Sequence, residues 1–192
     1  MHPQVAAACL VLLLLAACGT LPRDRYYTLT AAGGTPTPAA AASASSIAVG
    51  PVTVPEAVDQ PQFVVQVAAN QVAIHEFHRW ASPLKGEIAR VVAANLGQEL
   101  GTARVWAYGP AMLPTPDYQV LIDVQRFDST LGDAVVIDAL WTVRRAAGGA
   151  PKTGRSLVRE AATGAGFDPL VAAHSRALAR VSGDIANAIR TP

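Results

Sequence analysis

The sequence predicts one α/β domain, in which two helices cover one face of a mixed, largely antiparallel sheet. Three observations predict this class. Most of the chain divides into short segments rich in β-branched and aromatic residues, several of which alternate apolar and polar residues with the period of a strand. Two longer segments repeat apolar residues at the helical spacing instead. The length of 192 residues suits a single domain with a buried core.

Composition limits the classes of function. Only 15% of the residues are charged, 15 Lys and Arg stand against 14 Asp and Glu, and the formal net charge is +1. This balance argues against a strongly basic nucleic-acid binder and against an acidic disordered protein. No segment has 18 continuous apolar residues, so a polytopic membrane protein is not expected.

The N-terminal residues predict attachment to a membrane. Residues 5–17 are an uninterrupted apolar run, which is too short to span a bilayer comfortably and is typical of a signal peptide. Cys18 follows the run directly, and this junction resembles the lipobox of bacterial lipoproteins, in which the cysteine sulfur receives a diacylglyceryl group. The residues before the run depart from that pattern, because they contain no Lys or Arg. An uncleaved hydrophobic helix or a signal without lipid is the alternative.

We therefore expect residues 1–17 to be a lipoprotein signal peptide, residues 18–24 to be a lipidated tether and residues 25–192 to be the domain. Cleavage would leave Cys18 as the only cysteine, and the lipid would consume its thiol, so no disulfide is expected. Gly19 stands where an Asp would indicate retention in the inner membrane, and it favours the outer membrane.

The domain is predicted to begin with a strand and a flexible segment. Residues 25–30 are rich in aromatic and β-branched residues, whereas residues 31–46 contain little besides Ala, Gly, Thr, Pro and Ser. If the strand docks on the domain, seven residue steps separate it from Cys18, and seven extended residues reach roughly 25 Å. The domain would then lie close to the membrane surface.

Three more strands are predicted before the first helix. Residues 47–54 form one that Pro51 interrupts, which indicates an edge position or a bulge. Residues 63–67 and 72–77 predict a hairpin that turns at residues 68–71.

The first helix is predicted to begin with Ser82 as the N-cap and Pro83 at the first helical position, and to stop at Gly101. One of its faces repeats at the helical period. That face consists of Leu84, Ile88, Val91, Val92, Asn95, Leu96 and Leu100.

The second half predicts a short strand at residues 105–108 and then a β-meander of residues 118–125, 135–143 and 156–162. Alternation along the middle strand of the meander predicts one buried face. Its members are Val135, Ile137, Ala139, Trp141 and Val143.

Asp168 and Pro169 are predicted to cap the last helix. Its buried stripe is Leu170, His174, Leu178, Val181, Ile185 and Ile189.

Two segments partly match catalytic motifs, but a structural role explains both segments better. Ser82 and Lys85 match the S-x-x-K of penicillin-binding enzymes, but the companion motifs are poor or missing, so the serine is interpreted as a cap and the lysine as exposed. Residues 149–156 approach a P-loop. However, Arg155 replaces the required lysine and strands are predicted on both sides, which favours a hairpin turn.

The histidines do not predict a metal site. His75 and His78 are three residues apart at a strand end, where we expect them to point to opposite faces. His174 lies on the apolar stripe of the last helix and is interpreted as a packed core histidine. The sequence therefore predicts no catalytic, cofactor or metal site. The tryptophans are interpreted as core residues, although an apolar lipid groove would use the same residue type; they are Trp80, Trp106 and Trp141.

Several segments together resemble one family. They are Tyr-Tyr-Thr-Leu at 26–29, Val-Thr-Val-Pro at 52–55, Asp-Gln-Pro-Gln at 59–62, Phe-His-Arg-Trp-Ala-Ser-Pro-Leu at 77–84, Asn-Leu at 95–96, and Trp141. Together with the lipobox, their order and spacing are similar to the ABC-type transport auxiliary lipoproteins, the family of paraquat-inducible protein C. The resemblance implies an outer-membrane lipoprotein that accompanies an inner-membrane ABC permease and periplasmic MCE-domain proteins. Such a system moves phospholipids or other hydrophobic molecules across the periplasm.

The resemblance leads to the hypothesis of a docking subunit that is not an enzyme. Its expected partners are an MCE-domain periplasmic protein and the inner-membrane permease, and we expect a homo-oligomer that matches the symmetry of the partner. Pro55, Trp80 and Pro83 are the candidate contact residues, because loops on a rigid scaffold usually carry partner contacts. One alternative is an envelope assembly lipoprotein that chaperones an outer-membrane barrel or a lipopolysaccharide machine. The other is an acyl-serine enzyme that acts through Ser82 and Lys85.

Overall fold

The computed structural model describes residues 23–33, 45–109 and 115–191. The predicted signal peptide, Cys18 and most of the predicted flexible segment lie outside the described residues. No helix within these ranges is long and apolar enough to cross a membrane. The elements in chain order are β1 (Arg25–Tyr27), β2 (Ile47–Thr53), the 3-10 helix η1 (Glu56–Val58), β3 (Gln62–Ala68), β4 (Gln71–Trp80), α2 (Leu84–Leu100), β5 (Val105–Ala107), β6 (Tyr118–Thr130), β7 (Ala134–Arg145), β8 (Lys152–Ala161) and α3 (Asp168–Arg190).

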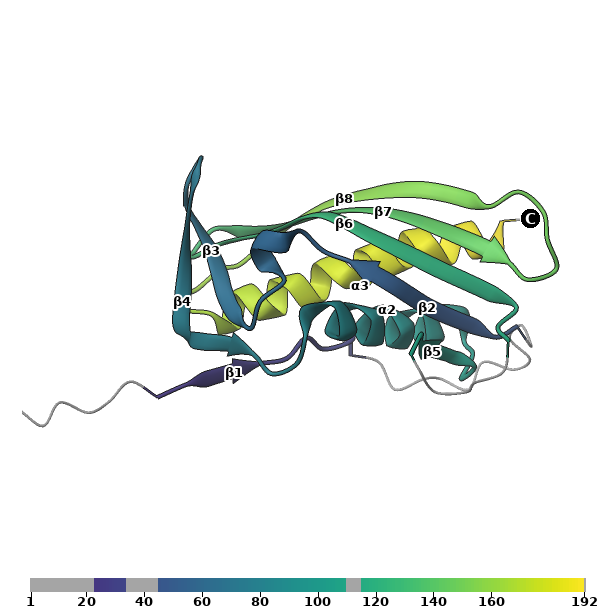
Figure 1. The fold of residues 1–192 in the computed structure, drawn as a ribbon, viewed down its shortest axis with the longest axis horizontal. Coiled ribbons are helices and arrows are strands. Elements are labelled where there is room, and N and C mark those ends of the chain that lie inside the picture. The colour runs from purple at the N-terminus through teal and green to yellow at the C-terminus, as the bar shows by residue number, and fades with distance from the viewer. Residues whose placement is uncertain (1–22, 34–44, 110–114, 192) are drawn as a thin grey trace, which may run out of the picture.

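The predicted α/β class is confirmed, and the strands form two sheets (Figure 1). The larger sheet has the order β5-β2-β6-β7-β8; its β6–β7 and β7–β8 pairs are antiparallel, and β2 is parallel to both of its neighbours. The smaller sheet has the order β1-β4-β3 and consists of the β3–β4 hairpin with β1 parallel to β4. The hairpin stands at one end of the molecule, and the C-terminal end of α3 lies at the other (Figure 1).

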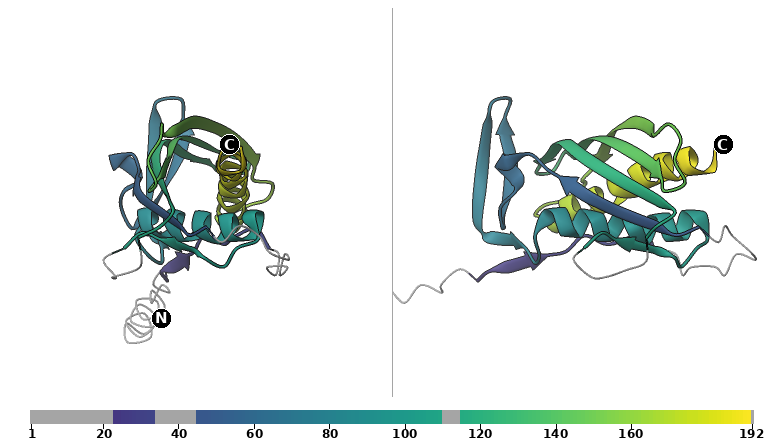
Figure 2. Two further views of the ribbon diagram at one scale, coloured as in Figure 1. Left: turned by 90° about the vertical axis from the view of Figure 1, so that its right-hand side faces the viewer. Right: turned by 45° about the vertical axis from the view of Figure 1, so that its right-hand side comes forward.

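Both helices pack against the same side of the curved five-stranded sheet, as Figure 2 shows in its end-on view. The predicted buried face of β7 is confirmed, since all five of its residues are buried. The predicted stripe of α3 is confirmed as well: Leu170, His174, Leu178, Val181 and Ile185 are buried, and Ile189 packs against the core. Strand alternation and helical periodicity therefore place the main core correctly.

Pro51 lies at a bulge and not at an edge. The pairing of β2 with β6 shifts register between Val49 and Val52, while β2 itself lies between β5 and β6 in the interior of the sheet. Proline has no backbone N–H to donate, so an interior strand accommodates it where the ladder is interrupted.

Both helices begin one residue away from the predicted position. Pro83 is the N-cap of α2, and its carbonyl accepts hydrogen bonds from the backbone N–H groups of Gly86 and Glu87 at 3.0 and 3.1 Å. The prediction of Ser82 as the cap is wrong, because Pro83 has an extended backbone with a ψ of 127° and the first helical residue is Leu84. The N-cap of α3 is Phe167, and no side chain caps that helix. The predicted stop at Gly101 is confirmed, with a φ of 62°.

The chain on both sides of the undescribed segment 34–44 is tied to the domain. After β1, the backbone N–H of Leu29 donates to the Glu87 carboxylate at 3.1 Å, and that of Ala32 donates to Asn95 Oδ1 at 2.9 Å. Before β2, the backbone N–H of Ser46 donates to the Asp117 carboxylate at 2.6 Å. The N-terminal strand is thus docked on the domain.

Candidate functional site

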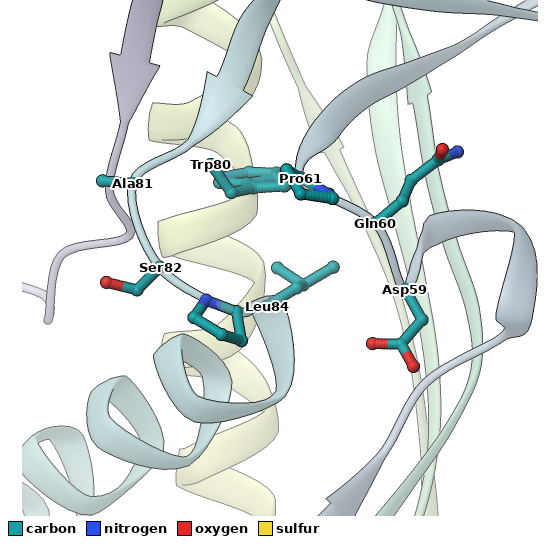
Figure 3. A pocket seen from close by; sticks show the side chains of 8 residues that line it. Asp59, Gln60, Pro61, Trp80, Ala81, Ser82 and Leu84 are labelled. Carbon is teal, nitrogen blue, oxygen red and sulfur yellow. The ribbon is translucent and has the colours of Figure 1, made fainter.

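A groove with a volume of about 370 Å³ lies where β4 leads into α2 (Figure 3). Residues 59–61, which follow η1, form one side of it, and residues 80–84 form the other. Two main-chain hydrogen bonds of 2.8 Å fix these segments: Trp80 N–H donates to the Pro61 carbonyl, and Ala81 N–H donates to the Tyr27 carbonyl. These hydrogen bonds hold residues 80 and 81 against two distant parts of the chain.

Trp80 forms the floor of the groove. Its side chain is only 5% exposed and stacks on Phe63 with ring centroids 4.5 Å apart. The edges of Phe127 and His174 approach it from the core, at 6.1 and 6.3 Å. These contacts hold the indole in one orientation, so that it presents a fixed apolar surface beside Pro61 (Figure 3).

The rim of the groove is polar. Lys85 Nζ lies 2.6 Å from the Asp59 carboxylate, and this ion pair links the start of α2 to the segment after η1. Both side chains are more than a third exposed, so the pair contributes little to stability. The same contact bears on the acyl-serine alternative, because the Lys85 ammonium is held by Asp59 and not by Ser82, which is exposed and precedes the helix.

Two of the three predicted contact residues come together in the groove. Trp80 and Pro83 both line it, whereas Pro55 lies before η1 and is not among the lining residues. Asp59, Gln60 and Pro61 line the opposite side and are not among the three candidate contact residues. Their signal was present in the Asp-Gln-Pro-Gln run at 59–62, but only the fold places that run opposite Trp80.

A second cavity, of about 650 Å³, lies between β1, β4 and the start of α3. It brings His75 and His78 together, contrary to the prediction that they point to opposite faces. Both rings pack against Phe167, with centroid distances of 4.9 and 3.8 Å. In the β3–β4 ladder Gln62 pairs with Arg79, but Phe63 already pairs with His75. Three residues of β4 thus bulge out of the ladder and reset the alternation of side chains.

The histidine cluster is aromatic in character. His78 Nδ1 shares a hydrogen bond of 2.7 Å with the Tyr27 hydroxyl, and the two rings stack. Burial, followed by the neighbouring His75 and Arg25, lowers the pKa of His78, and burial raises the pKa of Tyr27. Both groups are therefore neutral near pH 7. No cluster of three or more His, Cys, Asp or Glu with metal-site geometry occurs within the described ranges.

The near-match to a P-loop has a structural explanation. Lys152–Ala161 is strand β8, and Gly154 pairs with Trp141 on β7. A Cβ atom at position 154 would lie 2.1 Å from the Trp141 ring, so the ring occupies the space that a side chain would need. Trp141 Nε1 donates to Ser156 Oγ at 3.1 Å, and Ser156 Oγ donates to the Asp184 carboxylate at 2.6 Å. This glycine makes room for an indole and not for a phosphate.

His174 is a packed core histidine, as predicted. The side chain is fully buried, stacks on Phe127 at 3.9 Å and shares a 2.8 Å hydrogen bond with Ser129 Oγ through Nε2. Its Nδ1 has no hydrogen-bond partner. Burial lowers the pKa of His174 to about 3, so the ring is neutral at physiological pH.

Comparison with known proteins places the chain in a family. Residues 27–186 match the family described as ABC-type transport auxiliary lipoprotein component. A solved protein described only as uncharacterized shares 22% identity and a TM-score of 0.69, over 87% of this chain and 99% of that one. A protein from Xanthomonas campestris shares 19% identity and a TM-score of 0.69, over 86% of this chain and 94% of its own. These two likenesses show the fold. No protein of curated function matches the chain.

Proposed function

Since this chain belongs to the family of ABC-type transport auxiliary lipoprotein components, we propose that it is the outer-membrane docking subunit of an MCE-domain transport system. In this proposal, lipid on Cys18 holds the protein at the periplasmic face of the outer membrane. The protein receives an MCE-domain protein, and an inner-membrane permease supplies the energy. The system moves phospholipids or other hydrophobic molecules, and the lipoprotein itself performs no catalysis and holds no cofactor.

The extent of the family match is the observation that carries the proposal. Residues 27–186 include β2 to β8, all of α2 and most of α3. The matched unit is therefore the folded domain and not a short motif, and the groove lies inside it. The predicted family, in which the docking role was the expectation, is the family that the chain belongs to.

The groove is the surface we assign to the partner. Its floor is the fixed indole of Trp80, and Pro61 and Pro83 line its sides. Aromatic side chains are enriched in protein interfaces, and rigid walls lose little conformational entropy when a partner binds. An apolar side chain from a loop of the MCE-domain protein is the ligand that this groove would accept, with Lys85 and Asp59 at the rim.

The proposal is tested by mass spectrometry of proteins that co-purify with the gently solubilised, full-length lipoprotein. We expect an MCE-domain protein and its permease with the unaltered chain. Ser82→Arg places a long charged side chain at the exposed lining of the groove, and we expect it to abolish the recovery. Thr153→Arg is the matched control, since Thr153 is exposed on β8 in the five-stranded sheet, and it should leave recovery unchanged.

Other outcomes would redirect or contradict the proposal. Recovery of an outer-membrane barrel in place of an MCE-domain protein would favour the envelope assembly alternative. Recovery of neither class of partner would contradict the docking role. Sedimentation of the purified chain measures the homo-oligomer that we expect to match the partner's symmetry.

A further inference from the structure

The three-stranded sheet carries an unusual share of exposed apolar side chains. Within the described ranges nine large hydrophobic residues are exposed, and five of them lie on this small sheet. We call these five the hairpin patch. The patch consists of Tyr26 at 62% exposure, Val67 at 53%, Val72 at 50%, Ile74 at 51% and Phe77 at 45%. Clustered exposed apolar residues indicate contact with another apolar surface.

The strand pairing shows where β1 lies relative to the hairpin. β1 runs parallel to β4, with Arg25 opposite His78 and Tyr27 opposite Trp80. Arg25 therefore lies beside the end of the hairpin that is farthest from its turn. Figure 1 shows β1 and the hairpin at the same end of the molecule, away from the C-terminus.

The tether is short. Seven residue steps separate Cys18 from Arg25, which is a reach of roughly 25 Å when extended. Because Arg25 pairs with His78 at the base of the hairpin, an acylated Cys18 would hold the hairpin, and not the far end of α3, near the bilayer.

We propose that the hairpin patch lies in the interface of the phospholipid bilayer to which the chain is attached. This inference rests on the lipid attachment in the proposed function. Val72 and Ile74 supply aliphatic groups that enter the edge of the acyl region, and Tyr26 and Phe77 supply aromatic rings of the kind that membrane interfaces favour.

The charges around the patch fit a zwitterionic headgroup. Arg23, Arg25 and Arg79 lie on or beside β1 and β4, and so do Asp24 and Glu76. Guanidinium groups bind lipid phosphate, and carboxylates bind the ammonium of ethanolamine or choline. Because both signs are present, binding should depend weakly on salt and should not require an anionic lipid.

The first test reproduces the attachment in vitro. A chain of residues 18–192 keeps every described residue, and Cys18 is its only cysteine. Its thiol is coupled to a maleimide lipid in vesicles of phosphatidylcholine and phosphatidylethanolamine whose acyl chains carry bromine. We expect bromine to quench the added fluorescence of Ile74→Trp, relative to the unaltered chain. Leu157→Trp, at an exposed site on β8, should not be quenched. Equal quenching of the two added tryptophans by bromine would overturn the proposal.

The second test removes the apolar groups. Val72→Thr with Ile74→Thr keeps the β-branched shape, and we expect it to weaken the binding of residues 19–192 to the same vesicles roughly tenfold. Leu140→Thr with Leu157→Thr is the matched control on the other sheet and should not change binding. Unchanged binding of the first pair would overturn the proposal. Self-association of the unaltered chain without vesicles, lost in the first pair, would assign the patch to a second copy and would also overturn it.

Neither test requires an MCE-domain protein. Failure of the docking role, with quenching at position 74 intact, would leave the bilayer contact standing. Recovery of the partner, with quenching absent, would leave the docking role and remove this inference.

Discussion

The two sheets of this protein use similar strand sequences for different purposes. In the five-stranded sheet, alternate residues of β7 enter a core closed by α2 and α3. In the three-stranded sheet, Phe63 and Val65 are buried, but Val72, Ile74 and Phe77 are about half exposed. The apolar content of a strand therefore does not show whether its side chains are buried in this chain or left at the surface. The five-stranded sheet has one face closed by helices, whereas the three-stranded sheet contributes to the core and also leaves several apolar side chains exposed.

The largest effect on stability is expected where the five-stranded sheet is most tightly packed. Gly154→Ala forces a methyl group against the Trp141 ring, and we expect a loss of about 3 kcal/mol in the free energy of unfolding. Gly183→Ala is the control, because nothing lies within 4 Å of a Cβ at that helical position, and alanine should add about 0.5–1 kcal/mol. Urea denaturation measures both. If Gly154→Ala lowers the free energy of unfolding by no more than Gly183→Ala changes it, the Trp141 ring does not require a glycine at position 154.

A pH-dependent effect is expected from His174. Burial holds its pKa near 3 in the folded chain, whereas the unfolded ring takes up a proton below about 6.5. The contribution of the neutral His174 ring to the free energy of unfolding is therefore fully present above pH 6.5, and it is lost as the pH falls from there toward 3. Between pH 7 and pH 5 we expect the unfolding free energy to fall by about 2 kcal/mol more in the native chain than in His174→Phe. Parallel pH profiles of the two chains would contradict the neutral buried state.

A smaller effect is expected at the joint between the two regions. Burial alone would raise the pKa of Glu87, but hydrogen bonds from Arg90, Thr28 and the Leu29 backbone outweigh it and lower the pKa. Glu87→Gln should lower the free energy of unfolding by about 1.5 kcal/mol above pH 4.5. This difference from the native chain should disappear as acid protonates the Glu87 carboxylate.

The readout is local as well as global. Amide hydrogen exchange at Leu29 should accelerate in Glu87→Gln, because the backbone there loses its charged acceptor. Glu99→Gln is the control on the same helix, since its pairing with Arg190 is exposed. If Glu99→Gln releases Leu29 to the same extent, the Glu87 contact does not hold β1 in place.

The smallest effect on stability is expected in the hairpin patch. Val72→Thr with Ile74→Thr should change the unfolding free energy by less than about 0.5 kcal/mol, because both side chains are half exposed and threonine keeps the β-branched shape. A small change in stability together with a large loss of vesicle binding would show that these side chains act at the membrane and not in the fold. A loss of 2 kcal/mol or more would place the patch in the core instead.

Sequence periodicity predicted the main core, where one face of each helix or strand is buried within this chain. It placed the face of β7, the stripe of α3 and the packed state of His174, because burial on one face imposes a regular period. It did not predict that His75 and His78 share a face, since a bulge of three residues depends on the pairing of β4 with β3. It also missed the division into two sheets, which is set by contacts between distant segments.

The groove was predictable only in part. Trp80 and Pro83 were predicted as contact residues because they lie close to a loop on a rigid scaffold, and they do line the groove. Pro55 does not line the groove, whereas Asp59 and Pro61 line it without having been among the three candidate contacts. Which loop faces Trp80 is decided by the long-range hydrogen bond from Trp80 N–H to the Pro61 carbonyl, which no local pattern reports.

Photo-crosslinking in cells tests whether the groove and the hairpin patch have separate partners. Benzoylphenylalanine replaces Ser82 in the groove, Ile74 in the hairpin patch, or Leu157 on the five-stranded sheet. We predict an MCE-domain protein crosslinked from position 82, lipid without protein from position 74, and neither from position 157. If position 82 yields no more crosslinked protein than position 157, the groove does not dock a partner.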